Sequence, residues 1–170
     1  MSVSLQNRVA IVTGSTTGLG KAIALALGQA GAKVGVNYFN NSERAERTMA
    51  EFEAAGVTAK LVRGSAIEEA DVDRLFTEVE SAFGPVDIVV PNATPDQPLK
   101  PIEEYDWDFY QSMLDYFVKS PFLLARRALP NMKKRTWGRI INITSEVYHL
   151  SVAPFSAYVA AKGGQIGWSR

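Results

Sequence analysis

Tyr158 and Lys162 are the residues of this 170-residue chain whose types and spacing point most directly to chemistry. They are four residues apart in a segment with a helical pattern, so their side chains are predicted to share one face of a helix. A free tyrosine, with a pKa of about 10, is a poor acid–base catalyst at neutral pH, but a neighbouring ammonium favours the phenolate. The pair is therefore a candidate for protonating a carbonyl oxygen or deprotonating an alcohol. A chance pairing on a helix is the alternative.

Ser145 precedes Tyr158 and lies at the predicted exit of a strand. Ligands bind outside the carboxyl ends of the strands in an open parallel sheet. The Ser145 hydroxyl is therefore a candidate hydrogen-bond partner for a substrate oxygen, and a serine that caps the strand exit is the alternative. The following residues Tyr148 and His149 are candidates for lining a substrate site, although a lone loop histidine is more often solvated.

A glycine-rich turn is the third candidate. Residues 13–20 read TGSTTGLG, follow a predicted strand and open a predicted helix. Gly14 permits a tight turn, Gly18 lets a phosphate approach the backbone, and Gly20 lets the helix pack close to the sheet. The free N–H groups at a helix start attract the pyrophosphate of a dinucleotide. Because the spacing is not the usual G-x-G-x-x-G, an ordinary strand–turn–helix corner stays an alternative.

The elements that must position these residues alternate along the chain. We predict strands at 9–12, 33–38, 58–62, 87–90 and 139–144. We predict helices at 18–30, 42–55 with Ser42 as N-cap, 69–83, within 102–134 with a break near Ser120-Pro121, and from 157 onward. This alternation indicates βαβ units. The predicted fold is a doubly wound, Rossmann-type α/β sheet of strand order 3-2-1-4-5, in a single dinucleotide-binding domain over 1–170.

Composition excludes several classes of function. Eighteen Lys and Arg residues balance eighteen Asp and Glu residues, which argues against a nucleic-acid partner. The chain has no cysteine and a single histidine, so disulfides, cysteine nucleophiles and histidine-rich metal sites are excluded and we expect no metal. No apolar run approaches the roughly 20 residues of a membrane helix, and the N-terminus does not resemble a secretory signal. We therefore expect a cytoplasmic protein without a membrane partner.

Taken together, four segments resemble the short-chain dehydrogenase/reductase family, and within it the 3-oxoacyl-acyl-carrier-protein reductase-like members. They are the turn at 13–20, DIVVPNA at 87–93, GRIINITS at 138–145 and YVAAK at 158–162. They occur in the family's order and spacing over nearly the whole chain. The resemblance implies NAD(P)(H)-dependent hydride transfer between nicotinamide and a small carbonyl or alcohol substrate. It also implies a homo-oligomer, a dimer or a tetramer, built on the long helix before the fifth strand and the tyrosine-bearing helix.

The resemblance also implies roles for single residues. Tyr158 would be the catalytic acid/base, Lys162 would stabilise its phenolate and bind the nicotinamide ribose, and Ser145 would orient the substrate carbonyl. The implied cofactor-binding residues are Gly14, Ser15, Thr17, Gly18, Leu19, Gly20, Tyr38, Phe39, Asn40, Ser65, Ala66, Asn92, Ala93, Tyr158 and Lys162.

Several positions depart from the family pattern. Pro91 and Thr94 replace an asparagine and a glycine, and Ser65-Ala66 replaces an Asp-Val pair that lies against the adenine. Phe117 stands where the family has an asparagine that holds a proton-relay water. Because a phenyl ring cannot hydrogen-bond a water in this way, the relay is in doubt.

The choice between NADP(H) and NAD(H) depends on the end of the second strand. The family binds the ribose of NAD with an acidic residue there, where this chain has Tyr38, and Phe39 stands where an NADP-binding arginine is often found. No carboxylate would repel a 2′-phosphate, and the polar residues 40–42 could donate to one. We therefore expect a preference for NADP(H).

The chain ends at Arg170, inside the last predicted helix, whereas the resemblance implies a further strand–helix unit and a last strand. The fifth strand is then expected at a sheet edge, and we expect the chain to be a fragment, unstable or dependent on a partner if it is complete. Two functions stay open. One is an active oxidoreductase of this type, and the other is a catalytically inactive nucleotide-binding or partner-binding fragment of one.

Overall fold

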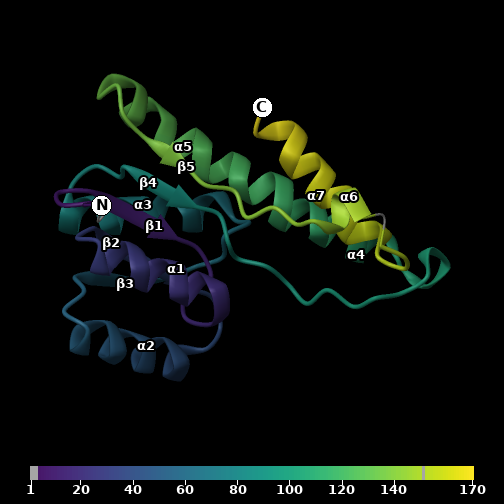
Figure 1. Ribbon diagram of the computed structural model, residues 1–170, viewed down its shortest axis with the longest axis horizontal. Helices are drawn as coiled ribbons and strands as arrows, with labels where there is room; N and C mark the ends of the chain where they lie inside the picture. The colour runs from purple at the N-terminus through teal and green to yellow at the C-terminus, as the bar shows by residue number, and fades with distance from the viewer. Residues whose placement is uncertain (1–3, 151) are drawn as a thin grey trace.

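Five parallel strands form one sheet of order β3-β2-β1-β4-β5 in the computed structural model, which describes residues 4–150 and 152–170 (Figure 1). The strands are β1 (Val9–Val12), β2 (Lys33–Tyr38), β3 (Ala59–Arg63), β4 (Ile88–Val90) and β5 (Arg139–Ile140). The predicted fold class and strand order are confirmed, and β5 lies at the edge of the sheet. The chain extends the sheet from β1 to one side and then returns to place β4 on the other side. Such a reversal is where open α/β sheets bind ligands.

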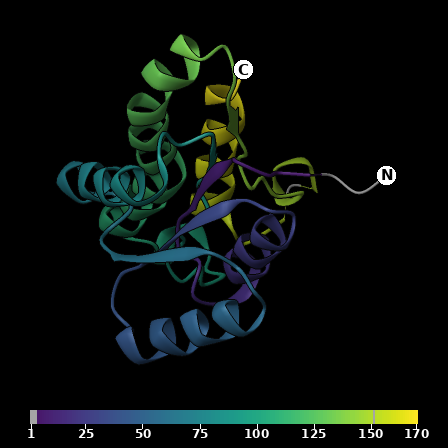
Figure 2. The ribbon, with the colours of Figure 1, turned by 90° about the vertical axis from the view of Figure 1, so that its left-hand side faces the viewer.

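Helices cover both faces of the sheet (Figure 2). Alternate residues of β1 serve opposite faces, as expected for a buried parallel strand. Val9 and Ile11 pack with residues of α3 and α5, whereas Ala10 and Val12 pack with residues of α1 and α2. The helices are α1 (Gly18–Gln29), α2 (Ser42–Ala54), α3 (Glu69–Phe83), α4 (Trp107–Leu114), α5 (Ser120–Lys134), α6 (Val147–Leu150) and α7 (Ser156–Trp168). None of the helices in the described part of the chain is long and apolar enough to cross a membrane.

A third, smaller apolar cluster lies where α7 packs against α4 and the π-helical turn Asp115–Lys119. Met113 and Phe117 meet Ala157 and Ala161 there, and several aromatic side chains surround them. This cluster places the N-terminal half of α7 beside the carboxyl ends of the strands, and it positions Tyr158.

Three local predictions need correction. Asn41, not Ser42, caps α2, because its side chain accepts a hydrogen bond from the backbone N–H of Arg44 at 2.8 Å. The irregularity in the long helical region is the π-helical turn Asp115–Lys119, which runs directly into α5 at Ser120, and the chain stays helical through Pro121. The fifth strand is shorter than 139–144, and α6 was not predicted because four residues carry no clear periodicity.

Candidate functional site

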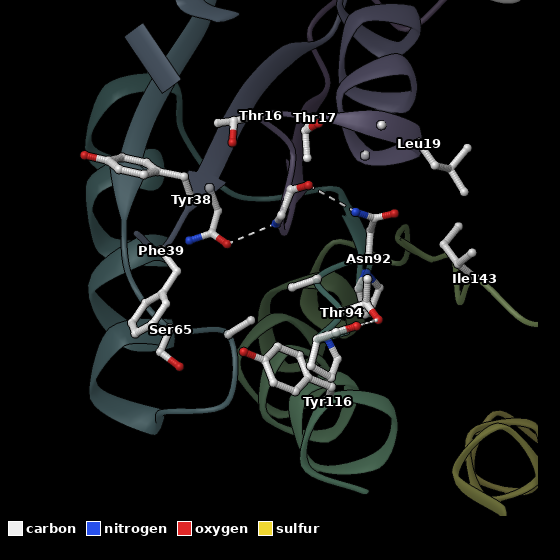
Figure 3. Close-up of a pocket in the computed structure, with 18 of the residues that line it drawn as sticks. Thr16, Thr17, Leu19, Tyr38, Phe39, Ser65, Asn92, Thr94, Tyr116 and Ile143 are labelled. Carbon is white, nitrogen blue, oxygen red and sulfur yellow. Dashed lines mark hydrogen bonds between the residues drawn. The ribbon is translucent and has the colours of Figure 1, made fainter. Parts of the chain in front are cut away.

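A cavity of about 750 Å³ opens along the carboxyl ends of β1 to β4 (Figure 3). We call it the cleft. It is lined by the glycine-rich turn, by the segments after β2, β3 and β4, by the π-helical turn and by α7. Every predicted cofactor-binding residue lines the cleft except Ser15. Segments far apart in the sequence therefore meet at one rim of the sheet.

The glycines of the turn differ in what requires them. Gly14 has a φ of 60°, and a Cβ built on it would lie 2.9 Å from the Cα of Ala93. A Cβ on Gly20 would overlap the side-chain amide of Asn92, so α1 and the end of β4 can approach only because this residue is glycine. Gly18, with a φ of 52°, has open space around its Cα. The backbone before α1 is thus held tightly at Gly14 and Gly20 and is accessible from the cleft at Gly18.

Thr13 and Asn92 connect the turn to the end of β4. The Thr13 hydroxyl accepts hydrogen bonds from the backbone N–H groups of Asn92 and Ala93, at 2.9 and 3.0 Å. The Asn92 side chain donates in return to the carbonyls of Thr13 and Gly14, at 3.0 and 3.2 Å. The contacts of Asn92 and Ala93 therefore support the turn itself.

Asn37 is a structural residue of the cleft that sequence reasoning missed. Its side-chain oxygen accepts from the backbone N–H of Gly14 at 3.2 Å, and its amide donates to the carbonyl of Gly64 at 3.0 Å. Ser15 is buried beside it, where its hydroxyl donates to the Val12 carbonyl at 2.6 Å and accepts from the Asn37 N–H at 3.0 Å. These bonds explain why Ser15 does not face the cleft.

Ser65 is held at the cleft by Asp71 of α3. The backbone N–H of Ser65 donates to the Asp71 carboxylate at 2.7 Å, and this bond holds the pKa of that carboxyl below its ordinary value. Partial burial opposes the effect, and the Arg74 guanidinium adds to it. Because Asp71 stays charged at neutral pH, the loop after β3 keeps this anchor.

Arg44 lines the cleft in the first turn of α2, close in the chain to Tyr38, Phe39 and Asn40. Its Nε is buried, and no residue in the described part of the chain accepts a hydrogen bond from it. A cation in the first turn of a helix is disfavoured by the helix dipole. That unfavourable position is the signal by which the sequence marks Arg44 as a candidate anion-binding residue.

Tyr158 and Lys162 both line the cleft from α7. The Tyr158 ring stacks on Phe155 at 4.7 Å and meets the Phe117 ring edge-on at 5.2 Å. Lys162 is only 3% exposed, and its Nζ lies 5.5 Å from the centre of the Tyr158 ring. Burial lowers the pKa of Lys162 to about 8. The Tyr158 ring and the buried Lys162 ammonium thus lie close together, and both residues line the cleft.

Ser145 does not line the cleft among the described residues. Its Oγ accepts a hydrogen bond of 3.4 Å from the Val147 N–H at the start of α6. Tyr148 and His149 lie on α6 with their rings 5.1 Å apart, and both are exposed. The structure therefore brings Tyr158 and Lys162 together with the turn and leaves Ser145 beside α6.

The strand order and the flanking helices define a doubly wound α/β protein of the Rossmann type. A profile of the short chain dehydrogenase family matches residues 8–170, so the chain belongs to that family. It is 36% identical over 169 residues to 2-dehydro-3-deoxy-D-gluconate 5-dehydrogenase of Formosa agariphila, in an alignment that covers 96% of this chain and 63% of that protein. It is 35% identical over 166 residues to the 3-oxoacyl-acyl-carrier-protein reductase FabG of Staphylococcus epidermidis, covering 96% and 67%.

A solved structure gives the same result. The crystal structure of a protein assigned as a gluconate dehydrogenase, from Agrobacterium tumefaciens, superimposes with a TM-score of 0.92 at 34% identity and covers all of this chain. This chain covers 66% of that protein. The chain therefore spans about two thirds of the length of the relatives that it matches.

Proposed function

We propose that this chain carries the cofactor-binding and acid–base parts of an NAD(P)(H)-dependent oxidoreductase. Its reaction is hydride transfer between nicotinamide and a carbonyl or secondary alcohol substrate. The observation that carries the proposal is the position of Tyr158 and Lys162 on the same cleft as the glycine-rich turn. The names of the relatives, a dehydrogenase and a reductase, support the same reaction class.

The residues of the cleft fit a dinucleotide. The cavity of about 750 Å³ is within the range of cofactor sites. Gly18 leaves the backbone before α1 open, and Thr17 precedes the helix without a side-chain cap, so the N–H groups of the first turn are available to a pyrophosphate. The residues that would hold the two ends are Tyr38, Phe39 and Asn40 on one side and Tyr158 and Lys162 on the other.

The chemistry of the protein residues follows from their positions. NAD(P)H, when bound, supplies the hydride for a carbonyl carbon. Tyr158 donates its hydroxyl proton to the carbonyl oxygen as negative charge develops there, and it accepts a proton from the alcohol in the reverse direction. The positive charge of Lys162 stabilises the phenolate that remains. Ser145 bonds the start of α6 and does not line the cleft in the described part of the chain, so its role as the hydrogen-bond partner of the substrate oxygen stays a proposal from the family resemblance.

Two finer proposals concern the cofactor and the assembly. Arg44 is a cation with a free buried N–H near the expected position of the adenosine ribose, and it favours NADP(H), whose 2′-phosphate it would bind. The exposed apolar side chains of α5 favour a homo-oligomer.

Tyr158→Phe tests the reaction. We expect the variant to lower kcat by about 10²- to 10⁴-fold, because it removes the group that handles the proton. NADPH binding, measured by calorimetric titration, should be retained, since the phenyl ring keeps its packing and the other cleft residues are unchanged. Turnover is followed by NADPH absorbance, with reduction of a 3-oxoacyl thioester and oxidation of 2-dehydro-3-deoxy-D-gluconate as probe reactions. Equal turnover by the variant and the wild type would sink the assignment of Tyr158. Nucleotide binding without turnover in the wild type would favour a non-catalytic nucleotide-binding role.

A further inference from the structure

Lys162 is a buried cation at the edge of the cleft. Its side chain forms no ion pair with any residue in the described part of the chain. Moving an unpaired ammonium out of water is costly, and its three N–H groups need acceptors. The surroundings of Lys162 therefore have to provide them.

Three groups surround the ammonium. The Nζ donates hydrogen bonds to the carbonyl of Ile143 and to the side-chain oxygen of Gln165, the latter at 3.0 Å. On the third side lies the Phe117 ring, whose centre is 4.1 Å from Nζ. An ammonium at this distance from an aromatic ring is attracted by the ring quadrupole, most strongly where water is excluded. Two hydrogen bonds and one aromatic face thus surround the ammonium within the protein.

Gln165 and Phe117 lie beside the Lys162 ammonium for different structural reasons. Gln165 is buried and follows Lys162 by three residues on α7, so both lie on one helix face. Phe117 is buried in the π-helical turn, a rare geometry that is frequent at functional sites. Its ring touches the edge of Tyr158 as well as Lys162. Phe117 therefore connects the acid–base candidate and the cation.

We propose that Gln165 and Phe117 are positioning residues that hold the Lys162 ammonium beside Tyr158 and keep water away from it. Gln165 supplies the acceptor that keeps the ammonium charged. Phe117 closes the remaining side with a surface that attracts the cation and hydrogen-bonds no water. In this arrangement Lys162 acts as a fixed positive charge beside Tyr158.

The elements packed around Lys162 carry other ionisable groups, and α4 contributes Asp108 and Tyr110. Tyr158 lies one turn earlier on α7, and the π-helical turn carries Asp115, Tyr116 and Lys119, of which Asp115 accepts a hydrogen bond from Gln111 at 3.1 Å. The segment 141–144 after β5 carries no ionisable side chain. From α6, the ring of Tyr148 packs against Gly163, with His149 beside it. A carboxylate introduced at position 165 would therefore be the first to pair with Lys162.

Direct titration of Lys162 tests the proposal without any activity. The chain is produced with lysine labelled with ¹³C at Cε, the Lys162 resonance is assigned by its loss in Lys162→Met, and its shift is followed with pH. The expected wild-type midpoint is near the pKa of about 8 that burial produces. Gln165→Glu should raise the midpoint by about one pH unit or more, because an anion favours the ammonium, and Gln165→Met should lower it. Gln29→Glu, an equal charge change at an exposed helical position, should leave it unchanged.

The Phe117 ring is tested in the same way. Phe117→Tyr keeps an aromatic face and should keep the wild-type midpoint, whereas Phe117→Leu removes the ring and should lower it. Thermal melting by circular dichroism establishes that each variant is folded. The proposal is overturned if the midpoint is the same in wild type, Gln165→Glu and Gln165→Met. The role of Phe117 is overturned if the Leu and Tyr variants titrate alike.

A test by enzyme activity rests on the proposed function, so its result is interpreted separately from the NMR titration. Carbonyl reduction needs a charged Lys162, so kcat should fall as pH rises through its pKa. This alkaline limit should move to higher pH in Gln165→Glu and to lower pH in Gln165→Met, while KM for NADPH stays within about twofold. If the NMR midpoints shift as expected and no variant turns over substrate, the positioning role stands and the proposed reductase function falls. If turnover is found and the limits do not move, the positioning role falls alone.

Discussion

Asn37 shows how a single side chain can set the shape of the cleft. It bonds the backbone of Gly14 on one side and the carbonyls of Gly64 and Val62 on the other, at the carboxyl ends of three neighbouring strands. A buried N–H or carbonyl left without a partner costs about 1–3 kcal/mol. The amide of Asn37 therefore stabilises the separation between the glycine-rich turn and the loop after β3, which is the width of the cleft.

Among single residues, Arg44 leads to a testable prediction about cofactor preference. Arg44→Ala should weaken NADPH binding by about 10- to 100-fold and leave NADH binding unchanged, because only the 2′-phosphate would pair with the guanidinium. Calorimetric titration with both cofactors gives the two affinities. Arg47→Ala is the matched control, since Arg47 lies on the same helix, is paired with Glu43 and is 64% exposed. Equal losses for NADPH and NADH, or no loss, would contradict a phosphate-binding role.

At the scale of structural elements, the conformation of the turn between β1 and α1 is tightly constrained by its neighbours. Thr13, Gly14 and Gly20 are all in contact with the segment after β4, so the turn cannot shift without breaking the hydrogen bonds of Asn92. Gly14 also has a left-handed backbone conformation, which residues other than glycine adopt only with strain. The start of α1 is thereby fixed relative to the sheet.

Gly14→Ala tests this rigidity. A side chain at a left-handed position costs about 1–2 kcal/mol, and its Cβ would also press on the backbone of Ala93. We expect the free energy of unfolding in urea to fall by about 2 kcal/mol or more, together with a loss of NADPH affinity. Gly167→Ala is the control, because a Cβ there meets nothing within 4 Å and alanine favours a helix. Equal stability of Gly14→Ala and the wild type would show that the turn can adapt.

Across the whole molecule, Asp87 ties together parts that are distant in the chain. Its side chain is 3% exposed. It accepts hydrogen bonds from the Val9 N–H at 2.9 Å and from Arg135 after α5 at 2.6 Å. The carboxylate thus joins β1, β4 and the end of α5 at the amino ends of these strands, opposite the cleft. The apolar clusters on the two faces of the sheet both contain residues of β1 and β4, so Asp87 helps to fix the strands that the two clusters share.

The outer face of α5 leads to a prediction about assembly. Phe122 and Leu129 are 44% and 37% exposed, and they lie on one helical face with Arg126 between them, its guanidinium 5.2 Å from the Phe122 ring. We expect a dimer or a tetramer in sedimentation, and a monomer when Phe122→Glu and Leu129→Glu are combined, because charge opposes burial of this face. Glu46→Lys, on the exposed side of α2, should not change assembly. A monomeric wild type at high concentration would refute the prediction.

The sequence by itself determined the order of strands and helices, the class of fold and most of the cleft lining. These depend on information that is local in the chain. Buried strands read as apolar runs, α2 and α3 end just before Gly56 and Gly84, and the turn 13–20 has its glycines where the backbone needs them. Helix periodicity alone likewise predicts that Tyr158 and Lys162 share one face of a helix.

Only the tertiary structure decided which side chains meet. Arg44 lines the cleft, Ser15 is turned away from it, and Ser145 bonds the start of α6. No local sequence pattern predicts the direction of any of these side chains. The partners of Lys162 come from the segment after β5, from α7 and from the π-helical turn. The physical reason is that a buried charge selects its partners by position in space, and packing of α7 against α4 sets those positions.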